Sequence, residues 1–324
     1  ASDVYKRQGN IDLVVKRSED GGKTWSRIIT VWDDGDNVCG NPSPIVDQET
    51  GRIILVSCWN LGEDHEKQII DKTSKDSRRV YVLYSDNDGK SWSTPKEITS
   101  SVKHPDWTWY ATGPCHGIQL QGKKNKGRLV VAANHMVAGT KTYHSQLIYS
   151  DDKGETWKLG GIVNEHGGNE SSVVELKNGY LMLNMRNYNR EESKTRSYAI
   201  SKDGGETVSQ MSYLPELIEP ICQGSTLNYM KKGKISNNIL FSNPASTDKR
   251  EKMTIKLSEN NGKTWPYAYQ VYSGPSAYSD LTNLRNGNIG LLYEYGINNP
   301  YEKIGFIIIP VSYTHLTLPT ILRV

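Results

Sequence analysis

The sequence is short of the residues that mark several large classes of protein. It has four cysteines in 324 residues, Cys39, Cys58, Cys115 and Cys222, and no CxxC pair for zinc or redox chemistry. We therefore favour core or free thiols over a disulfide framework. Phenylalanine is scarcer still, with two residues against 19 tyrosines and 29 glycines. This balance suits turns and aromatic-bearing strands better than helices.

Long apolar runs and a strong net charge are also missing. No apolar run approaches the roughly 20 residues that a spanning helix needs, so we predict no membrane span. The net charge is only +3 and the basic residues are scattered, which argues against a nucleic-acid partner. The seven histidines show no HExxH or other clustered ligand spacing. We therefore predict no catalytic metal and no cofactor.

The two ends of the chain differ in character from its body. Residues 1–8, "ASDVYKRQ", show neither an apolar period nor a cap signal. Residues 311–324, "VSYTHLTLPTILRV", are rich in Thr and Leu, and Arg323 is their only formal charge. We expect both segments to be non-native and take residues 9–310 as the folded domain.

One short phrase occurs five times along the body of the chain. "RSEDGGKTW" begins at Arg17 and returns as "YSDNDGKSW", "YSDDKGETW", "ISKDGGETV" and "LSENNGKTW". The common pattern is Ser-x-Asp/Asn-x-Gly-x-Thr/Ser-Trp, although the fourth copy has Val in place of Trp. The Ser that opens this pattern is Ser18, Ser85, Ser150, Ser201 or Ser258 in the five copies. A period of this size indicates a unit of several strands.

The residues of the repeat predict a hairpin turn. Strand-like segments precede the copies, among them "IDLVVKR", "RVYVLY" and "MTIKL". Asp or Asn accepts hydrogen bonds from the backbone two residues on, and Gly supplies the positive φ. The Trp then starts the next strand and packs back over the hairpin. Repeated antiparallel sheets of this size, arranged radially, make a β-propeller, so we interpret the repeat as structural.

The repeats resemble the Asp boxes of sialidases (neuraminidases), a family of all-β, six-bladed propellers. Asp boxes alone are a weak functional signal, because propellers without sialidase activity also carry them. Four further segments are similar to sialidase segments in the same order: "NESSVVELKNGYLMLNMRN", "FSNPASTDKREKMTIKLS", "SGPSAYSDLTNL" and "GLLYEYG". The resemblance covers residues 9–310 and is nearest to bacterial exo-α-sialidases.

The resemblance implies a role for at least one residue in each segment. Tyr278 matches the catalytic nucleophile, and Glu170 matches the glutamate that assists it. Arg186 and Arg250 match the second and third members of an arginine triad that binds the substrate carboxylate. Glu294 matches the glutamate that supports the first arginine. The implied reaction is the hydrolysis of terminal α-linked sialic acids from glycoconjugates, with retention of configuration.

Elementary chemistry favours these residue types for such a substrate. Sialic acid carries a carboxylate on its anomeric carbon, and planar guanidinium groups bind carboxylates through paired, charge-assisted hydrogen bonds. A neutral phenol avoids the repulsion that a carboxylate nucleophile would meet, which fits the sialidase exception among glycosidases. Because a phenol has a pKa of about 10, Tyr278 needs a base within hydrogen-bond reach. Glu175, five residues after Glu170, would point to the opposite face of a strand.

Three segments could line the rest of a sugar pocket. The aromatic residues of "HPDWTWYATG" could form a wall, with core packing as an equal alternative. "VVAANHM" resembles a pocket-lining strand, and the acidic loop "GEDHEK" either binds sugar hydroxyls or is simply solvated. The candidates in these segments are Trp107, Trp109, Tyr110, Asn134, Met136, Glu63, Asp64 and Glu66.

Two residues of the family pattern have no match in this chain. In sialidases the first triad arginine lies in an Arg-Ile-Pro phrase, and the acid/base Asp follows just before the strand that matches "GNIDLVVKRS". Residues 1–8 contain no such phrase, and Asp3, their only carboxylate, does not fit that position. We therefore expect the chain to begin inside an incomplete first blade, without the acid/base Asp and the first arginine.

Other functions stay open at this point. A non-catalytic sialic-acid-binding propeller and an Asp-box interaction scaffold are the two alternatives. Trans-sialidases share the same residues, so hydrolysis and transfer are not distinguished, and neither linkage preference nor oligomeric state follows from the sequence. The resemblance implies sialylated glycans or glycoproteins as partners, and a secreted, periplasmic or cell-surface location.

Overall fold

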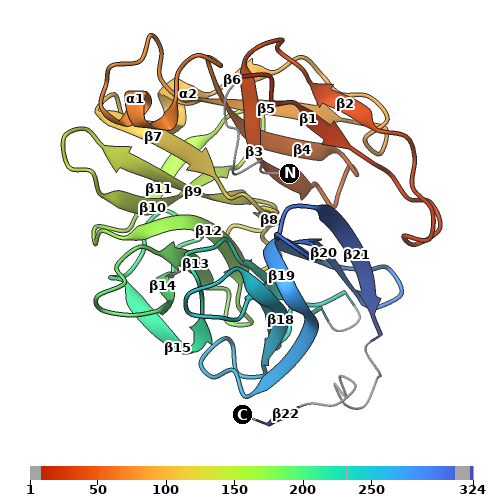
Figure 1. Cartoon of the computed structure of the whole chain (residues 1–324). Coiled ribbons are helices and arrows are strands. Elements are labelled where there is room, and N and C mark those ends of the chain that lie inside the picture. Colours follow the sequence, from red (N-terminus) through yellow and green to blue (C-terminus); the bar gives the residue numbers. More distant parts are fainter. Residues whose placement is uncertain (1–8, 231–232, 311–321, 324) are drawn as a thin grey trace.

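A computed structural model of the chain describes residues 9–230, 233–310 and 322–323 (Figure 1). Residues 1–8 and most of residues 311–324, the segments predicted to be non-native, lie outside the described residues. The described chain is built from strands, and its two helices, α1 (Glu66–Ile70) and α2 (Thr99–Val102), have five and four residues. The all-β prediction is therefore confirmed.

Three antiparallel sheets follow one another along the chain and stand side by side around a common centre (Figure 1). The first contains β3 (Val38–Val46), β4 (Ile53–Asn60), β5 (Arg79–Ser85) and β6 (Lys96–Glu97). The second contains β7 (Trp107–Thr112), β8 (Ile118–Gln119), β9 (Leu129–Val137), β10 (Tyr143–Ser150) and β11 (Lys158–Ile162). The third contains β12 (Gly168–Glu175), β13 (Leu181–Asn187), β14 (Thr195–Ser201) and β15 (Ser212–Ile218). This propeller-like arrangement is the one that the repeats predict.

A larger sheet and a small one complete the described fold. The seven-stranded sheet contains β16 (Ser225–Asn228), β17 (Ile239–Pro244), β18 (Glu251–Ser258), β19 (Tyr267–Asn283), β20 (Ile289–Tyr295), β21 (Lys303–Ile309) and β22 (Leu322–Arg323). The two-stranded sheet contains β1 (Leu13–Val15) and β2 (Ile29–Trp32). The long strand β19 pairs first with β18 and then, from Ser276 onward, with β20.

Each copy of the repeat forms the same hydrogen-bonded turn. The hydroxyl oxygen of its Ser accepts the backbone N–H of the Gly four residues on, at 2.6 to 2.9 Å in the five copies. The Asp or Asn accepts the N–H of the Thr or Ser four residues on, at 2.9 to 3.0 Å. The predicted span of two residues is therefore wrong, because the turn is wide enough for the side chain to bridge it. The Gly adopts positive φ in all five copies, as predicted.

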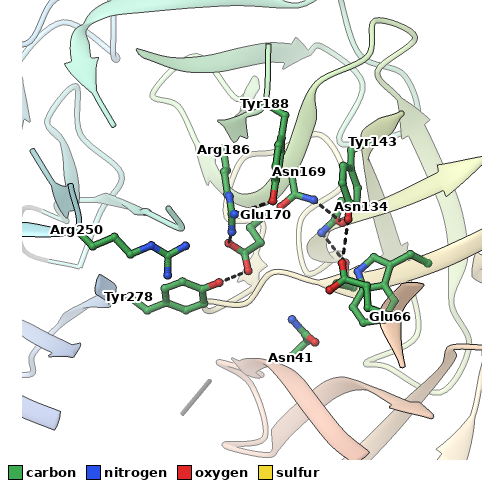
Figure 2. A pocket seen from close by; sticks show the side chains of 12 residues that line it. Asn41, Glu66, Asn134, Tyr143, Asn169, Glu170, Arg186, Tyr188, Arg250 and Tyr278 are labelled. Atoms are coloured by element: carbon green, nitrogen blue, oxygen red, sulfur yellow. Dashed lines mark hydrogen bonds and ion pairs between the residues drawn. The ribbon is translucent and has the colours of Figure 1, made fainter. Parts of the chain in front are cut away.

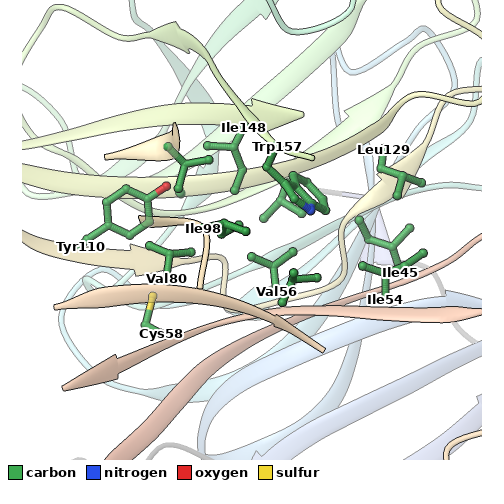
Figure 3. Close-up of a cluster of buried hydrophobic side chains, with 14 of the residues drawn as sticks. Ile45, Ile54, Val56, Cys58, Val80, Ile98, Tyr110, Leu129, Ile148 and Trp157 are labelled. Carbon is green, nitrogen blue, oxygen red and sulfur yellow. The ribbon is translucent and has the colours of Figure 1, made fainter. Parts of the chain in front are cut away.

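In two copies the Trp of the repeat packs back over its own turn. The indole N–H groups of Trp157 and Trp265 donate to the carbonyls of Gly154 and Gly262, at 2.9 and 3.1 Å. Trp157 is also part of an apolar cluster between the first and second sheets (Figure 3). Such clusters between neighbouring sheets form the core, and all four cysteines are buried as free thiols. The described residues contain no helix that is long and apolar enough to cross a membrane.

Candidate active site

A pocket of about 220 Å³ is lined by residues of β3, β7, β9, β10, β12, β13 and β19, of α1 and of two adjoining loops (Figure 2). Its lining is rich in polar and aromatic side chains. These residues are Asn41, Glu66, Trp109, Ala111, Asn134, Tyr143, Asn169, Glu170, Arg186, Tyr188, Arg250 and Tyr278. The pocket thus brings together four residues singled out from the sequence as nucleophile, assisting glutamate and two arginines.

Tyr278 and Glu170 are in direct contact in this pocket. The phenol Oη of Tyr278 donates a hydrogen bond to Oε1 of Glu170 (Figure 2). The backbone N–H of Tyr278 donates to Oε2 of Glu294 on β20, at 3.1 Å. Burial and the charge of Glu170 raise the pKa of Tyr278 well above its ordinary value. The phenol is therefore neutral at physiological pH, with a carboxylate placed to accept its proton.

Glu170 is held ionised by the groups around it. Burial acts to raise the pKa of the Glu170 carboxyl, but the charge of Arg186 and the hydrogen bond from Tyr278 outweigh it and lower the pKa. Nη1 of Arg186 lies 2.5 Å from Oε2 of Glu170, and its Nη2 donates to the hydroxyl of Tyr188 at 2.7 Å. Tyr278 and Arg186 thus use different oxygens of the same carboxylate.

Arg250 approaches the pocket from just before β18. Its Nη1 donates to the hydroxyl of Tyr301 at 2.8 Å, and its Nη2 donates to the carbonyl of Ile221 at 3.0 Å. The guanidinium carbon lies 5.7 Å from the ring centroid of Tyr278. Two guanidinium groups, from Arg186 and Arg250, therefore line one small cavity together with the tyrosine (Figure 2). Such a cavity is electrostatically suited to an anionic group.

Another part of the wall is polar without a cationic group. The hydroxyl of Tyr143 donates to Oε1 of Glu66 at 2.9 Å, and the Tyr143 ring stacks on that of Tyr188 with centroids 5.1 Å apart. Nδ2 of Asn169 donates to Oδ1 of Asn134 at 3.2 Å (Figure 2). These carboxylate, hydroxyl and amide groups can exchange hydrogen bonds with a polyhydroxylated ligand.

The residues proposed for the sugar pocket divide into two groups. Trp109, Asn134 and Glu66 line the pocket. The others are not among its lining residues: Trp107, Tyr110, Met136, Glu63 and Asp64. The carboxylate of Glu63 instead pairs with Nζ of Lys75 at 2.7 Å.

Each residue of the second group has other contacts. Trp107 stacks on His135 with ring centroids 3.4 Å apart, and Met136 is buried in an apolar cluster. The carboxylate of Asp64 accepts the backbone N–H groups of Lys75 and Asp76, both at 2.9 Å, and so fixes the loop after α1. Tyr110 is fully buried in the core.

Several lining residues were not found from the sequence. Asn41, Tyr143, Asn169 and Tyr188 belong to this group. Two signals were present: Tyr188 follows Arg186 at the two-residue spacing of one strand face, and Asn169 directly precedes Glu170. Tyr143 carried no local signal, because its position depends on how the second sheet is placed beside the third.

The fold defines a class, that of β-propellers with Asp-box hairpins, and comparisons with known proteins define a family within it. Residues 5–291 match the family model described as BNR repeat-like domain. The chain is similar to the sialidase of Bacteroides fragilis (strain YCH46), with 32% identity over 90% of this chain and 55% of that protein. It is also similar to the sialidase of Micromonospora viridifaciens, with 30% identity over 91% of this chain and 46% of that protein.

A solved structure agrees with these relatives. The Hadza microbial sialidase Hz136 superposes with a TM-score of 0.78 at 32% identity, over 90% of this chain and 58% of that one. The chain therefore belongs to the BNR repeat-like domain family, and the resemblance to bacterial sialidases is confirmed. It spans about half the length of the two bacterial relatives.

Proposed function

We propose that this protein hydrolyses terminal α-linked sialic acids with retention of configuration. The observation that carries the proposal is the contact between the Tyr278 hydroxyl and the Glu170 carboxylate, in a pocket that Arg186 and Arg250 also line. A buried tyrosine beside an ionised glutamate has the arrangement of a nucleophile with its base. The sialidase names of the relatives support the same conclusion.

The reaction would proceed in two displacement steps. Glu170 accepts the Oη proton while Oη forms a bond to the anomeric carbon, and the glycosidic C–O bond breaks. The leaving alkoxide takes a proton from an acid, so the products of this step are an alcohol and a sialyl–Tyr278 intermediate. Water then attacks the anomeric carbon and gives a proton to the conjugate base of that acid. The bond to Oη breaks, and Glu170 returns its proton to Tyr278. Two inversions at one carbon give net retention.

The two arginines would orient the substrate for this attack. Their guanidinium groups bind the carboxylate on the anomeric carbon, which places that carbon beside Oη. Arg186 also pairs with Glu170, so its charge serves both the substrate and the base. Glu66, Asn134 and Trp109 lie in the wall of the same pocket and would contact the remainder of the sugar.

We further propose that residues 9–310 form one domain of six blades. Because β19 pairs with β18 along its first part and with β20 along its second, it would pass from the fifth blade to the sixth. The sheet of β1 and β2 would be part of the first blade. Since sialylated glycans and glycoproteins are the proposed substrates, we propose a secreted, periplasmic or cell-surface location.

Hydrolysis of an aryl sialoside tests the function directly. We expect turnover by the chain, release of the α-anomer first by proton NMR, and loss of turnover in Tyr278→Phe but not in Tyr269→Phe, a tyrosine outside the pocket. A fluorinated sialic acid should label the peptide that contains Tyr278. Turnover that survives Tyr278→Phe would disprove the proposed nucleophile.

The same assay separates the alternatives. Sialic-acid binding without turnover, unchanged by Tyr278→Phe, would identify a binding propeller. Absence of affinity and indifference to Arg186→Ala would identify a scaffold. Comparing sialyl-lactose with the aryl sialoside measures how well this chain supplies the general acid, because an aryl leaving group needs less protonation.

A further inference from the structure

The connection between β7 and β8, residues 113–117, lies against the strand that carries Glu170. The backbone N–H of Ser171 donates to the carbonyl of Gly113 at 3.0 Å. The thiol of Cys115 donates to the carbonyl of Ser171 at 3.4 Å. Both backbone polar groups of Ser171, the residue next to Glu170 in β12, are therefore bonded to this connection.

The same connection is also bonded to the strand that carries Tyr278. The backbone N–H of His116 donates to Oδ2 of Asp280 at 3.0 Å, and Nδ1 of its ring lies 2.7 Å from Oδ1 of Asp280. Asp280 is two residues after Tyr278 in the same strand, β19. Five residues of chain thus join the two catalytic strands.

Side chains hold this part of β19 along its backbone as well. Gln223 both accepts the N–H of Ser279 and donates to its carbonyl, each at 3.0 Å, as a neighbouring strand would. Ser225 accepts the N–H of Leu281 at 3.2 Å and donates to Oδ1 of Asp280 at 2.8 Å. The carboxylate of Asp280 is therefore shared between β16 and the 113–117 connection.

We propose that the pair of His116 and Asp280 is a positioning device that sets the distance between Tyr278 Oη and the Glu170 carboxylate. The inference rests on the proposed function for its catalytic consequence, although the geometry it concerns does not need a substrate. Displacing a nucleophile by about 1 Å can lower a rate on the order of a hundredfold. Neither residue of the pair lines the pocket, so both act through the strands that carry Tyr278 and Glu170.

The charge on His116 gives this device a pH dependence. Asp280 is the charged group that acts on His116: burial lowers the pKa of the imidazole, but the charge and hydrogen bond of Asp280 outweigh burial and raise it. Because the pKa of His116 is raised in the folded state, the pair contributes its full stabilisation below the unfolded pKa of about 6.5. Its contribution is lost as the pH rises through the raised pKa.

Kinetics of three variants test the proposal. His116→Ala removes the ring, His116→Asn keeps a neutral donor in its place, and His104→Ala removes a surface histidine as a matched control. We expect His116→Ala to lower kcat roughly 10- to 100-fold with little change in KM. His116→Asn should retain most of kcat. It should also lose the decrease in kcat that follows deprotonation of His116 as the pH rises. A kcat for His116→Ala within twofold of the control, or an equal decline in His116→Asn, would overturn the proposal.

A measurement without substrate decides the geometry if no sialoside is turned over. Tetranitromethane nitrates tyrosines through the phenolate, and peptide mass spectrometry follows the rate at Tyr278. Loosening the contact with Glu170 should bring the raised pKa of Tyr278 down and speed its nitration in His116→Ala, but not in His104→Ala. Equal nitration rates in all variants would reject the positioning role, whatever the wild-type activity shows. An inactive wild-type chain with faster nitration in His116→Ala would reject only the proposed function.

Discussion

At the scale of single residues, the neighbours of Glu170 set the protonation state of its carboxyl group. Its carboxylate is buried, and an isolated buried carboxylate would take up a proton. The ion pair with Arg186 and the hydrogen bond from Tyr278 keep the pKa low instead. In the proposed mechanism, one side chain therefore acts as a base and holds a substrate-binding arginine in place.

Glu170→Gln should abolish the base while keeping the shape of the side chain. We expect kcat on an aryl sialoside to fall roughly 10²- to 10⁴-fold, because general-base assistance has about that value. Since the pKa of Glu170 is lowered, the wild-type acid limb should lie below the ordinary glutamate value of about 4.3. The control is Glu175→Gln in the same strand, whose carboxylate accepts the N–H groups of Gln121 and Gly122. Equal losses in both variants would show that only the strand was disturbed.

Arg250→Lys should separate charge from geometry. Lysine keeps the positive charge but cannot form paired hydrogen bonds to a carboxylate, nor bond Tyr301 and Ile221 together as Arg250 does. We expect KM to rise roughly 10- to 100-fold, which corresponds to about 1–3 kcal/mol of lost interaction. Arg52→Lys, at a surface ion pair with Asp86, is the control. An unchanged KM would show that Arg250 does not bind the substrate carboxylate.

Trp107 and Trp109 show why a residue-level pattern was insufficient. The two are separated by the spacing of one strand face, so no sequence pattern distinguishes them. The pairing of β7 with β9 is irregular between Trp107 and Tyr110, and this irregularity changes the direction of the side chains. Trp109 consequently lines the pocket, while Trp107 stacks on His135.

At the scale of elements, the Asp-box hairpins depend on glycine as much as on the aspartate. Gly154 has φ of 93°, and a Cβ placed there would lie 3.3 Å from Cγ2 of Ile54 in the neighbouring sheet. Gly127 has φ of 89°, and a Cβ there would have no heavy atom within 4 Å. The two positions therefore share the backbone strain and differ in the contact.

Gly154→Ala should accordingly destabilise the fold more than Gly127→Ala. We expect both to lower the free energy of unfolding by about 1 kcal/mol from backbone strain, with a further loss in Gly154→Ala from crowding against Ile54. Urea denaturation measures the difference. If the two variants have the same free energy of unfolding, then the hairpin is not packed against the neighbouring sheet as described.

At the scale of the whole molecule, the repeated turns make stability depend on ionised carboxylates. In Asp152 and Asp203 burial acts to raise the pKa, but hydrogen bonds from Thr156 and Thr207 outweigh it and lower the pKa. The pKa of Asp47 is lowered in the same way by Thr50 and Gln119. These groups recur in several sheets, so their protonation should affect the whole fold.

The melting temperature should therefore fall as the pH drops below about 4. A carboxyl with a lowered folded pKa contributes stability above its unfolded pKa, and that contribution is lost as the pH falls through the folded value. Scanning calorimetry between pH 6 and pH 3 measures how steeply the melting temperature depends on pH. These limits lie about two units above and about one unit below the ordinary aspartate pKa. Asp203→Asn, which keeps the acceptor oxygen without the charge, should show a shallower slope. Identical slopes would mean that the Asp-box carboxylates do not control acid stability.

The sequence by itself determined the local structure of this protein and, through family resemblance, a short set of candidate residues. Each repeat closes on itself within four residues, so its Ser, Asp and Gly suffice to specify the turn. The two-residue bond span was wrong, because the width of the turn depends on dihedral angles that a residue pattern does not give. Strand identity followed equally well from apolar patterning.

Only the tertiary structure decided which residues meet. Tyr278 and Glu170 are 108 residues apart, and His116 and Asp280 are 164 apart. Their contacts exist because neighbouring sheets direct their inner strands toward a common centre, and no local pattern encodes the rotation of one sheet against the next. The same reason explains why Tyr143 and Asn41 reach the pocket and Met136 does not. Turns depend on neighbours in the chain, whereas this site depends on neighbours in space.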